Sequence, residues 1–206
     1  CALYDTDRRA TEALAPSSDL ICDSFEALVD KSDAVYIATP HLQHYAQAKY
    51  ALERGRHVLC ETPMVLNADQ AEELYAIAER RGLILLEANK TAFCPAFNHL
   101  ISLIKSGLIG DVVGIDASES KLWGEENLKR ELDPKQAGGS LYEMGSYPLL
   151  PIIKLLGTDH RNINLYSRLN ENKVDVYTRG IMLYDSAVAS FQLGLGVKTE
   201  GNLVIS

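Results

Sequence analysis

Residues 33–63 read DAVYIATPHLQHYAQAKYALERGRHVLCETP, and this stretch contains a complete strand-helix-strand unit. Its two apolar runs, DAVYIATP and HVLCE, flank a segment over about 42–54 in which apolar residues recur at helical spacing and which stops at Gly55. Continuous apolar runs of this kind are typical of strands buried in a parallel sheet that is covered on both faces. The stretch therefore predicts a β-α-β unit of a layered α/β domain.

The same alternation of short strands and helices extends on both sides of this unit. The further strands expected are CALYD, ICDSF and LILLEAN, and the further helices expected lie near 7–14, 25–30 and 69–81. Either Asn67 or Asp69 can cap the last of these helices, and Gly82 ends it. Residues 1–92 are therefore predicted to form part of a Rossmann-like, doubly wound parallel sheet.

After about residue 93 the pattern changes from alternating elements to consecutive strands. A helix over 96–106 and the half-exposed strand pattern in VVGIDASESKLW precede a polar loop over 124–137 and an apolar helix over 141–156. Four more strands are expected near 162–169, 173–182, 186–194 and 201–206. We therefore expect residues 93–206 to form an α+β domain with an open, mainly antiparallel sheet.

The composition indicates a small-molecule partner. A net charge of −8 and a pI near 5.1 argue against nucleic acid or an anionic membrane, because both reward clustered Lys and Arg. No apolar run approaches the ~20 residues that span a bilayer. The four cysteines are far apart and form no C-x-x-C pair, so we expect no metal site, no disulfide framework and a cytoplasmic location.

Both ends of the sequence resemble strands that should have neighbours. CALYD is an apolar run closed by a carboxylate, and NLVIS stops within an apparent strand. We therefore expect this sequence to be an internal piece of a longer chain.

Ligands of an open parallel sheet bind outside the carboxyl ends of its strands, where the strand order reverses. The residues at the predicted strand ends are Asp5, Thr39-Pro40, Glu61-Thr62-Pro63 and Asn89-Lys90. An acidic residue that ends the second strand of a dinucleotide fold can accept hydrogen bonds from the ribose of NAD, and Asp5 has that character. A plain turn or a helix cap is the alternative for Asp5, and the sequence lacks the glycine fingerprint that would decide between them.

Several motifs together resemble one oxidoreductase family. These are residues 33–63, quoted above, GLILLEANKTAFCPAFNHLISLIKSGLIGDVVGIDAS and GGSLYEMGSYPL, which occur here in the family's order. In these motifs the sequence resembles the Gfo/Idh/MocA family of NAD(P)-dependent oxidoreductases. The resemblance implies a Rossmann domain followed by a domain with an open sheet, and hydride transfer between nicotinamide and a sugar or polyol.

The resemblance also implies roles for the strand-end residues of the first domain. Thr39-Pro40 and His44 match the family's T-P-x-x-x-H, whose start lines the dinucleotide, although His44 could equally be a surface or interdomain histidine. Glu61-Thr62-Pro63 matches E-K-P, whose lysine reaches the nicotinamide ribose and the reacting hydroxyl. A threonine can donate a hydrogen bond there, but it cannot supply an ammonium charge.

In the second domain the family's G-G-G-x-x-x-D-x-G-x-H appears here as Gly138-Gly139-Ser140, followed by Glu143, Gly145 and Tyr147. Some branches, those resembling glucose-fructose oxidoreductase and dihydrodiol dehydrogenase, use tyrosine in place of the histidine. Tyr147 is therefore a candidate proton donor or acceptor, and Glu143 retains the usual carboxylate. A phenol ordinarily ionises near ~10, so this role needs a cationic neighbour. The alternative is that Tyr147 only packs beneath its helix.

Lys90 is the candidate for the missing cation, because it follows LILLEAN at the same predicted sheet edge as Thr62. The alternative is a solvated lysine at a strand end. The leading hypothesis is an enzyme in which Tyr147, helped by Lys90 or Glu143, handles the hydroxyl proton. A catalytically silent relative that binds a dinucleotide or a sugar, and a structural subunit, are the other possibilities.

The cofactor expected is NAD or NADP. Asp5 favours NAD through the ribose hydroxyls, whereas Arg8 or Arg9 could meet the 2′-phosphate of NADP. The resemblance further implies a homo-oligomer, because the second-domain sheet commonly forms the dimer contact in this family.

Overall fold

A computed structural model describes residues 1–124 and 128–206 of the protein, which form two compact units, Cys1–Ala88 and Asn89–Ser206. Residues 125–127, part of the polar loop expected over 124–137, lie outside the described residues. Residues 89–92 belong to the second unit, because Asn89 donates a side-chain hydrogen bond to Ser146 and the turn that follows it packs on the next helix.

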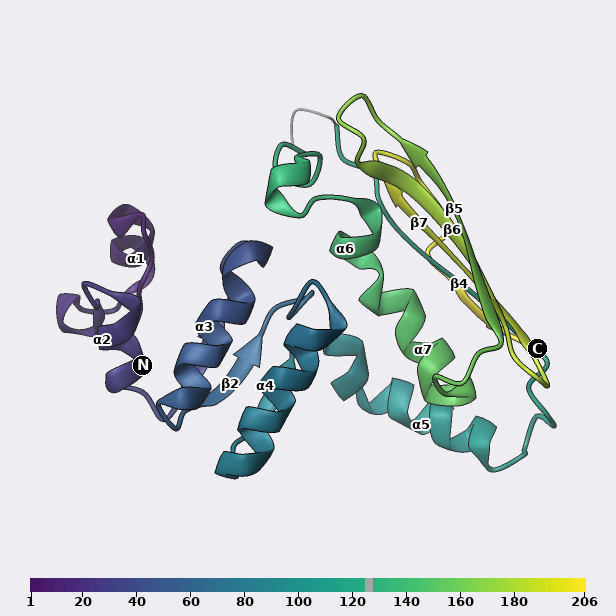
Figure 1. The fold of residues 1–206 in the computed structure, drawn as a ribbon, viewed down its shortest axis with the longest axis horizontal. Helices are drawn as coiled ribbons and strands as arrows, with labels where there is room; N and C mark the ends of the chain where they lie inside the picture. Colours follow the sequence, from purple (N-terminus) through teal and green to yellow (C-terminus); the bar gives the residue numbers. More distant parts are fainter. Residues whose placement is uncertain (125–127) are drawn as a thin grey trace. The chain divides into compact units, whose positions relative to one another are not determined.

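The first unit is built on a three-stranded parallel sheet in the order β1 (Ala34–Ile37), β2 (His57–Cys60) and β3 (Leu85–Glu87). The connections are α3 (His41–Glu53) and α4 (Ala68–Arg81), which pack against each other (Figure 1). The Rossmann-like parallel sheet expected from residues 33–63 is confirmed.

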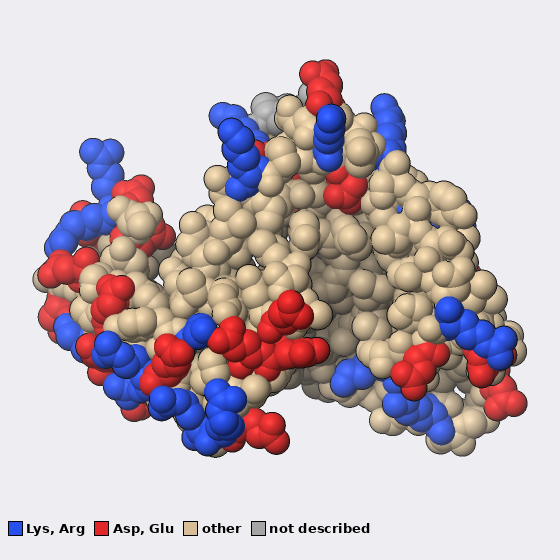
Figure 2. All heavy atoms as spheres, viewed as in Figure 1, with Lys and Arg blue, Asp and Glu red and all other residues tan. Residues whose placement is uncertain are grey.

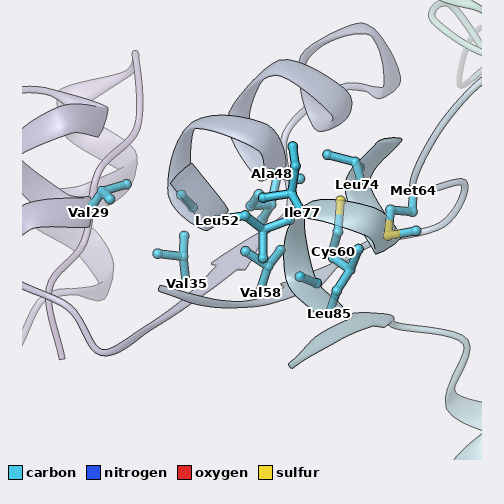
Figure 3. Close-up of a cluster of buried hydrophobic side chains, with 13 residues drawn as sticks. Val29, Val35, Ala48, Leu52, Val58, Cys60, Met64, Leu74, Ile77 and Leu85 are labelled. Atoms are coloured by element: carbon cyan, nitrogen blue, oxygen red, sulfur yellow. The ribbon is translucent and has the colours of Figure 1, made fainter. Parts of the chain in front are cut away.

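One face of this sheet makes the core of the first unit. Alternate strand residues point to α3 and α4, and they join a cluster (Figure 3) whose members are Val29, Val35, Ile37, Ala48, Ala51, Leu52, Val58, Cys60, Met64, Leu74, Ile77, Ala78 and Leu85. The residues between them, Tyr36, Leu59 and Leu86, are exposed on the other face. The two-residue period of a strand causes this division.

Local side-chain chemistry sets the ends of α4. Of the two possible caps, Asn67 is the one used, because its Oδ1 accepts a hydrogen bond from the Gln70 amide at 3.0 Å. The helix ends at Gly82, whose φ of 65° lies in the left-handed region that glycine adopts without steric cost.

The segment before β1 carries α1 (Arg8–Leu14), the 3₁₀ turn η1 (Ser18–Leu20) and α2 (Phe25–Asp30). The prediction of strands at CALYD and ICDSF was wrong, since these segments share only one parallel bridge, between Leu3 and Ile21. Among the residues that the structure describes, no third strand flanks this pair, so no ladder extends from it. On the face drawn in Figure 2, basic and acidic side chains are interspersed over α1 and α2.

The second unit opens with η2 (Lys90–Phe93) and α5 (Pro95–Lys105). Its sheet has the order β5-β6-β7-β4-β8 and consists of β4 (Gly114–Lys121), β5 (Asn162–Leu169), β6 (Asp175–Leu183), β7 (Val188–Leu195) and β8 (Leu203–Ile205). All neighbouring strands are antiparallel except β4 and β7. The mainly antiparallel sheet expected from the sequence is therefore confirmed.

Two consecutive helices, α6 (Ser140–Met144) and α7 (Ser146–Leu156), pack on one face of this sheet (Figure 1); the short turn η4 (Pro134–Gln136) precedes them. Gly145 between them has helical φ and ψ angles, so the single helix expected over 141–156 is divided only at this residue. The core between helices and sheet comprises Ile115, Leu128, Met144, Ile152, Met182, Ala189, Phe191, Leu193 and Leu195.

None of the helices among the described residues has both the length and the apolar character needed to cross a bilayer.

Candidate functional site

The candidate cofactor residues of the first unit lie where β1 and β2 end. In the parallel register Ile37 is opposite Cys60, so the loops that begin at Ala38 and Glu61 leave the same edge of the sheet. These loops carry Thr39-Pro40 and Glu61-Thr62-Pro63. The structure thus brings together the two segments that the sequence placed at the ligand edge.

His44 connects the two loops. It lies on α3 with only 1% of its surface exposed, so it is not a surface histidine. Its Nε2 is 2.5 Å from the Thr39 carbonyl oxygen, and its Nδ1 is 2.9 Å from the Pro63 carbonyl oxygen. Both ring nitrogens are therefore engaged with backbone, and a direct contact of His44 with a cofactor stays a prediction.

Glu61 is held by a tyrosine of the neighbouring strand. The Tyr36 hydroxyl donates a hydrogen bond to Glu61 Oε1. This bond to a carboxylate, reinforced by partial burial and by the Glu61 charge, raises the pKa of Tyr36 to about 12. The Glu61 side chain is thereby oriented at the strand end, and Tyr36 remains a neutral donor.

Thr62 follows Glu61 and is half-buried. Among the described residues, its hydroxyl makes no hydrogen bond, whereas the Thr39 hydroxyl donates to Gln47 at 2.7 Å. The loop after Thr62 is fixed from β3, because the Met64 amide donates to Glu87 Oε1 at 3.0 Å. Thr62 therefore presents a hydroxyl from a supported loop.

Asp5 forms a local turn, since its Oδ1 accepts a hydrogen bond from the Asp7 amide at 2.8 Å. The residue is exposed, and no hydrogen bond to its Oδ2 is seen within the described residues. Arg8 is engaged, because its guanidinium contacts Glu12 and Asp23 at 3.2 Å each. The turn that the sequence allowed for Asp5 is present, and one of its oxygens stays available to a ligand.

The two catalytic candidates of the second unit, Lys90 and Tyr147, each follow one partner of the hydrogen bond between Asn89 and Ser146. The buried Asn89 side chain caps η2 by accepting from the Thr91 amide at 3.2 Å, and it donates to the Ser146 carbonyl at 3.1 Å. Lys90 follows Asn89, and Tyr147 follows Ser146. Lys90 is exposed and Tyr147 is half-buried, and no hydrogen bond between them is seen in the part of the chain that the structure describes.

Glu143 lies on α6, one helical turn before Tyr147. Its carboxylate is almost completely buried and forms a two-pronged ion pair with Arg130, with contacts of 2.8 Å to Nη1 and 3.0 Å to Nη2. Arg130 also contacts Glu131 at 3.3 Å. Glu143 therefore anchors the segment before α6, a function that its motif position did not suggest.

Asp175 is a residue that sequence reasoning missed. Its Oδ2 accepts hydrogen bonds from the Ser140 hydroxyl at 2.6 Å and the Leu141 amide at 2.9 Å. Asp175, the first residue of β6, therefore caps the N-terminus of α6. This explains Gly139 in the motif, because Gly139 has a φ of 128° and a Cβ atom would lie 2.1 Å from Asp175 Oδ1. The need for glycine at this position depends on Asp175, which is distant in the sequence, so the sequence pattern alone could not reveal it.

Comparison with protein families matches both units. Residues 1–89 match the model described as an oxidoreductase family with an NAD-binding Rossmann fold, and residues 97–205 match the GFO/IDH/MocA C-terminal domain.

Individual relatives agree with this assignment. Bovine trans-1,2-dihydrobenzene-1,2-diol dehydrogenase is 34% identical over 187 residues, which cover 89% of this chain and 55% of the relative. D-xylose 1-dehydrogenase (NADP(+)) 2 of Haloferax volcanii is 32% identical over 169 residues, which cover 81% of this chain and 52% of the relative. The chain thus spans about half the length of these curated relatives.

A solved structure of a 3-ketoreductase from Actinomadura kijaniata, in complex with TDP-benzene and NADP, superposes with a TM-score of 0.75 at 26% identity. The match covers 96% of this chain and 60% of that protein. Together with the two matching family models, these similarities show that the chain belongs to the Gfo/Idh/MocA oxidoreductase family.

Proposed function

We propose that the protein is an NAD(P)-dependent dehydrogenase or reductase that acts on a sugar-like or polyol substrate. The observation that carries the proposal is the convergence of Thr39-Pro40 and Glu61-Thr62-Pro63 at one edge of a parallel sheet, in a chain of this family. The names of the relatives support the substrate class, since they act on a dihydrodiol and on xylose.

The residues at the strand ends suit a dinucleotide. Asp5 Oδ2 can accept from a ribose hydroxyl, and the Thr62 hydroxyl is available as a donor or acceptor. Arg8 contacts two carboxylates in exposed ion pairs, and Arg9 remains the other candidate for a 2′-phosphate, so the proposed cofactor is NAD or NADP. The bound nicotinamide would supply the hydride acceptor or donor.

In this proposal Tyr147 gives or takes the proton of the reacting hydroxyl, and Lys90 supplies the nearby positive charge. The Asn89 hydrogen bond to Ser146 supports the pair, because it holds the two backbone segments together. Arg130 is unsuited to the task, since its charge is offset by the carboxylates of Glu131 and Glu143.

The test is a hydride-transfer assay of the full-length protein with NAD and NADP against a panel of sugars and polyols, followed by absorbance of the reduced nicotinamide. Turnover of at least one substrate is expected. Tight dinucleotide binding in calorimetry without turnover of any substrate would contradict the enzymatic function.

A second candidate is a catalytically silent relative that binds a dinucleotide or a sugar. The observation that favours it is the exposed Lys90 side chain, combined with Thr62 at the position of the family's working lysine. Binding in calorimetry without turnover is the result that this candidate predicts.

We also propose a homo-oligomer that forms through the sheet of the second unit. Every residue of the edge strand β5 is exposed, and Tyr166 and Arg179 lie opposite each other on the face away from Phe191. Light scattering should give the mass of a dimer, and Tyr166→Glu should shift it toward the monomer. A monomeric wild-type protein would contradict this assembly.

A further inference from the structure

The two ring nitrogens of His44 face two acceptors. Nε2 is 2.5 Å from the Thr39 carbonyl oxygen and Nδ1 is 2.9 Å from the Pro63 carbonyl oxygen. A backbone carbonyl can only accept a hydrogen bond, and a neutral imidazole has a single N–H. In either neutral tautomer, one nitrogen lone pair would therefore point at a carbonyl oxygen.

Burial makes this arrangement restrictive. His44 is 1% exposed, so bulk water does not reach its ring. The nitrogen without a proton would therefore be buried with no hydrogen-bond donor facing it, which is disfavoured. The doubly protonated ring satisfies both carbonyls at once, with charge-assisted bonds that are stronger than neutral ones.

The charged residues at the ends of β2 and β3 are acidic. Glu61 directly follows β2, and Glu87 ends β3 and accepts a hydrogen bond from the Met64 amide, next to Pro63. Both carboxylates, after burial itself, raise the pKa of the Cys60 thiol at this strand end, to about 12. On α3, the ring centroid of His41 is 5.8 Å from that of His44, whereas Tyr45 and Lys49 both donate hydrogen bonds to Glu73.

We propose that His44 is doubly protonated and clamps the loop after β1 to the loop after β2, which makes it a positioning residue for the dinucleotide site. The clamp fixes the separation of Thr39 from Thr62-Pro63 through bonds to carbonyls on both loops. Its consequence for dinucleotide binding rests on the proposed function, whereas the protonation state of the ring does not.

The protonation state can be read directly on the full chain. Long-range ¹H–¹⁵N correlation spectra of the histidine rings, assigned with His44→Gln, should show both His44 nitrogens carrying a proton at about pH 7.5, where an ordinary histidine is neutral. His57 serves as the internal control, because its Nδ1 accepts from the Ile84 amide and must lack a proton. One protonated and one bare nitrogen on His44 at that pH would overturn the proposal.

A pair of substitutions tests the clamp. His44→Phe removes both donors, and the affinity for the dinucleotide is expected to fall about ten-fold or more, since a misplaced loop spoils ligand geometry. His44→Gln keeps an amide donor that can reach one of the two carbonyls, without a titrating ring, and it should lose clearly less affinity than His44→Phe. His57→Gln, at the opposite end of β2, should leave affinity unchanged.

The outcomes separate the two proposals. Equal loss of affinity in His44→Gln and His44→Phe, with both variants folded, would overturn the clamp. If the wild-type protein binds no dinucleotide, the proposed function fails, and the ring spectra still decide whether His44 is doubly protonated. If His44→Phe does not fold, His44→Gln and the spectra remain decisive.

Discussion

The Asn89 side chain donates a 3.1 Å hydrogen bond to the Ser146 carbonyl across 57 residues of sequence. Asn89 is buried and also caps η2, so this bond joins the start of the second unit to the junction of α6 and α7. Lys90 and Tyr147 are the residues that follow each partner. Two catalytic candidates that are far apart in the sequence are therefore carried on adjoining backbone segments.

Lys90→Met should abolish turnover in the full-length protein and leave dinucleotide affinity unchanged. Removing a charge that acts only on the developing alkoxide lowers kcat, and a loss of about 100-fold or more is expected. Lys105→Met, at an exposed lysine in the last turn of α5, is the control and should have normal kinetics. Near-normal turnover of Lys90→Met would refute the assigned role.

Thr62→Lys should rescue the Lys90→Met variant. The substitution returns an ammonium group to the position at which the family keeps its lysine, so kcat of the double variant should exceed that of Lys90→Met by about ten-fold or more. Steady-state kinetics of the two single variants and the double variant measure the coupling. A double variant as inactive as Lys90→Met would show that the charge at these two positions is not interchangeable.

Glu143→Gln should destabilise the second unit. The substitution retains shape but leaves the Arg130 guanidinium without its buried partner; because 34% of the Arg130 side chain is exposed, we expect a loss of about 1–3 kcal/mol in the free energy of unfolding. Urea unfolding measures this loss. Glu131→Gln, which removes a single 3.3 Å contact, should cost less, and equal losses would contradict the assignment.

Gly139→Ala should be more harmful than Gly82→Ala. Both glycines have positive φ, where an alanine is strained, but only at Gly139 would the new Cβ also meet Asp175, at 2.1 Å from Oδ1. Space is open around Gly82. Thermal and urea unfolding compare the variants, and similar destabilisation by both would show that Asp175 moves away readily.

Cys1 and Cys94 should react rapidly with a thiol reagent at about pH 8, whereas Cys22 and Cys60 should react only on unfolding. Burial raises the pKa of Cys60 to about 12, so the reactive thiolate stays rare in the folded protein until the pH rises toward that value. Counting released chromophore before and after denaturation checks this, and Cys94→Ser should remove one fast thiol. A third fast thiol in the folded wild-type protein would contradict the burial of the core cysteines.

Sequence patterns were sufficient wherever short-range chemistry decides the structure. The strand-helix-strand unit of residues 33–63 was predictable because apolar periodicity distinguishes a buried strand from a helix, and Gly82 was predictable as the end of α4 because only local backbone geometry is involved. CALYD shows where this reasoning fails. An apolar run becomes a strand only if a neighbouring strand accepts its hydrogen bonds, and here a single bridge forms.

The candidate site divides in the same way. The family resemblance identified Thr62 as the departure from E-K-P and named Glu143 and Tyr147 as candidates, and the predicted sheet edge named Lys90. The tertiary structure added the interaction partners: Arg130 forms an ion pair with Glu143, Asn89 donates a hydrogen bond to the Ser146 carbonyl, and two backbone carbonyls face the ring of His44. Such contacts join side chains to groups that are distant along the chain, and no periodic pattern encodes them. They depend on where the backbone places each partner, which is a property of the packed chain as a whole.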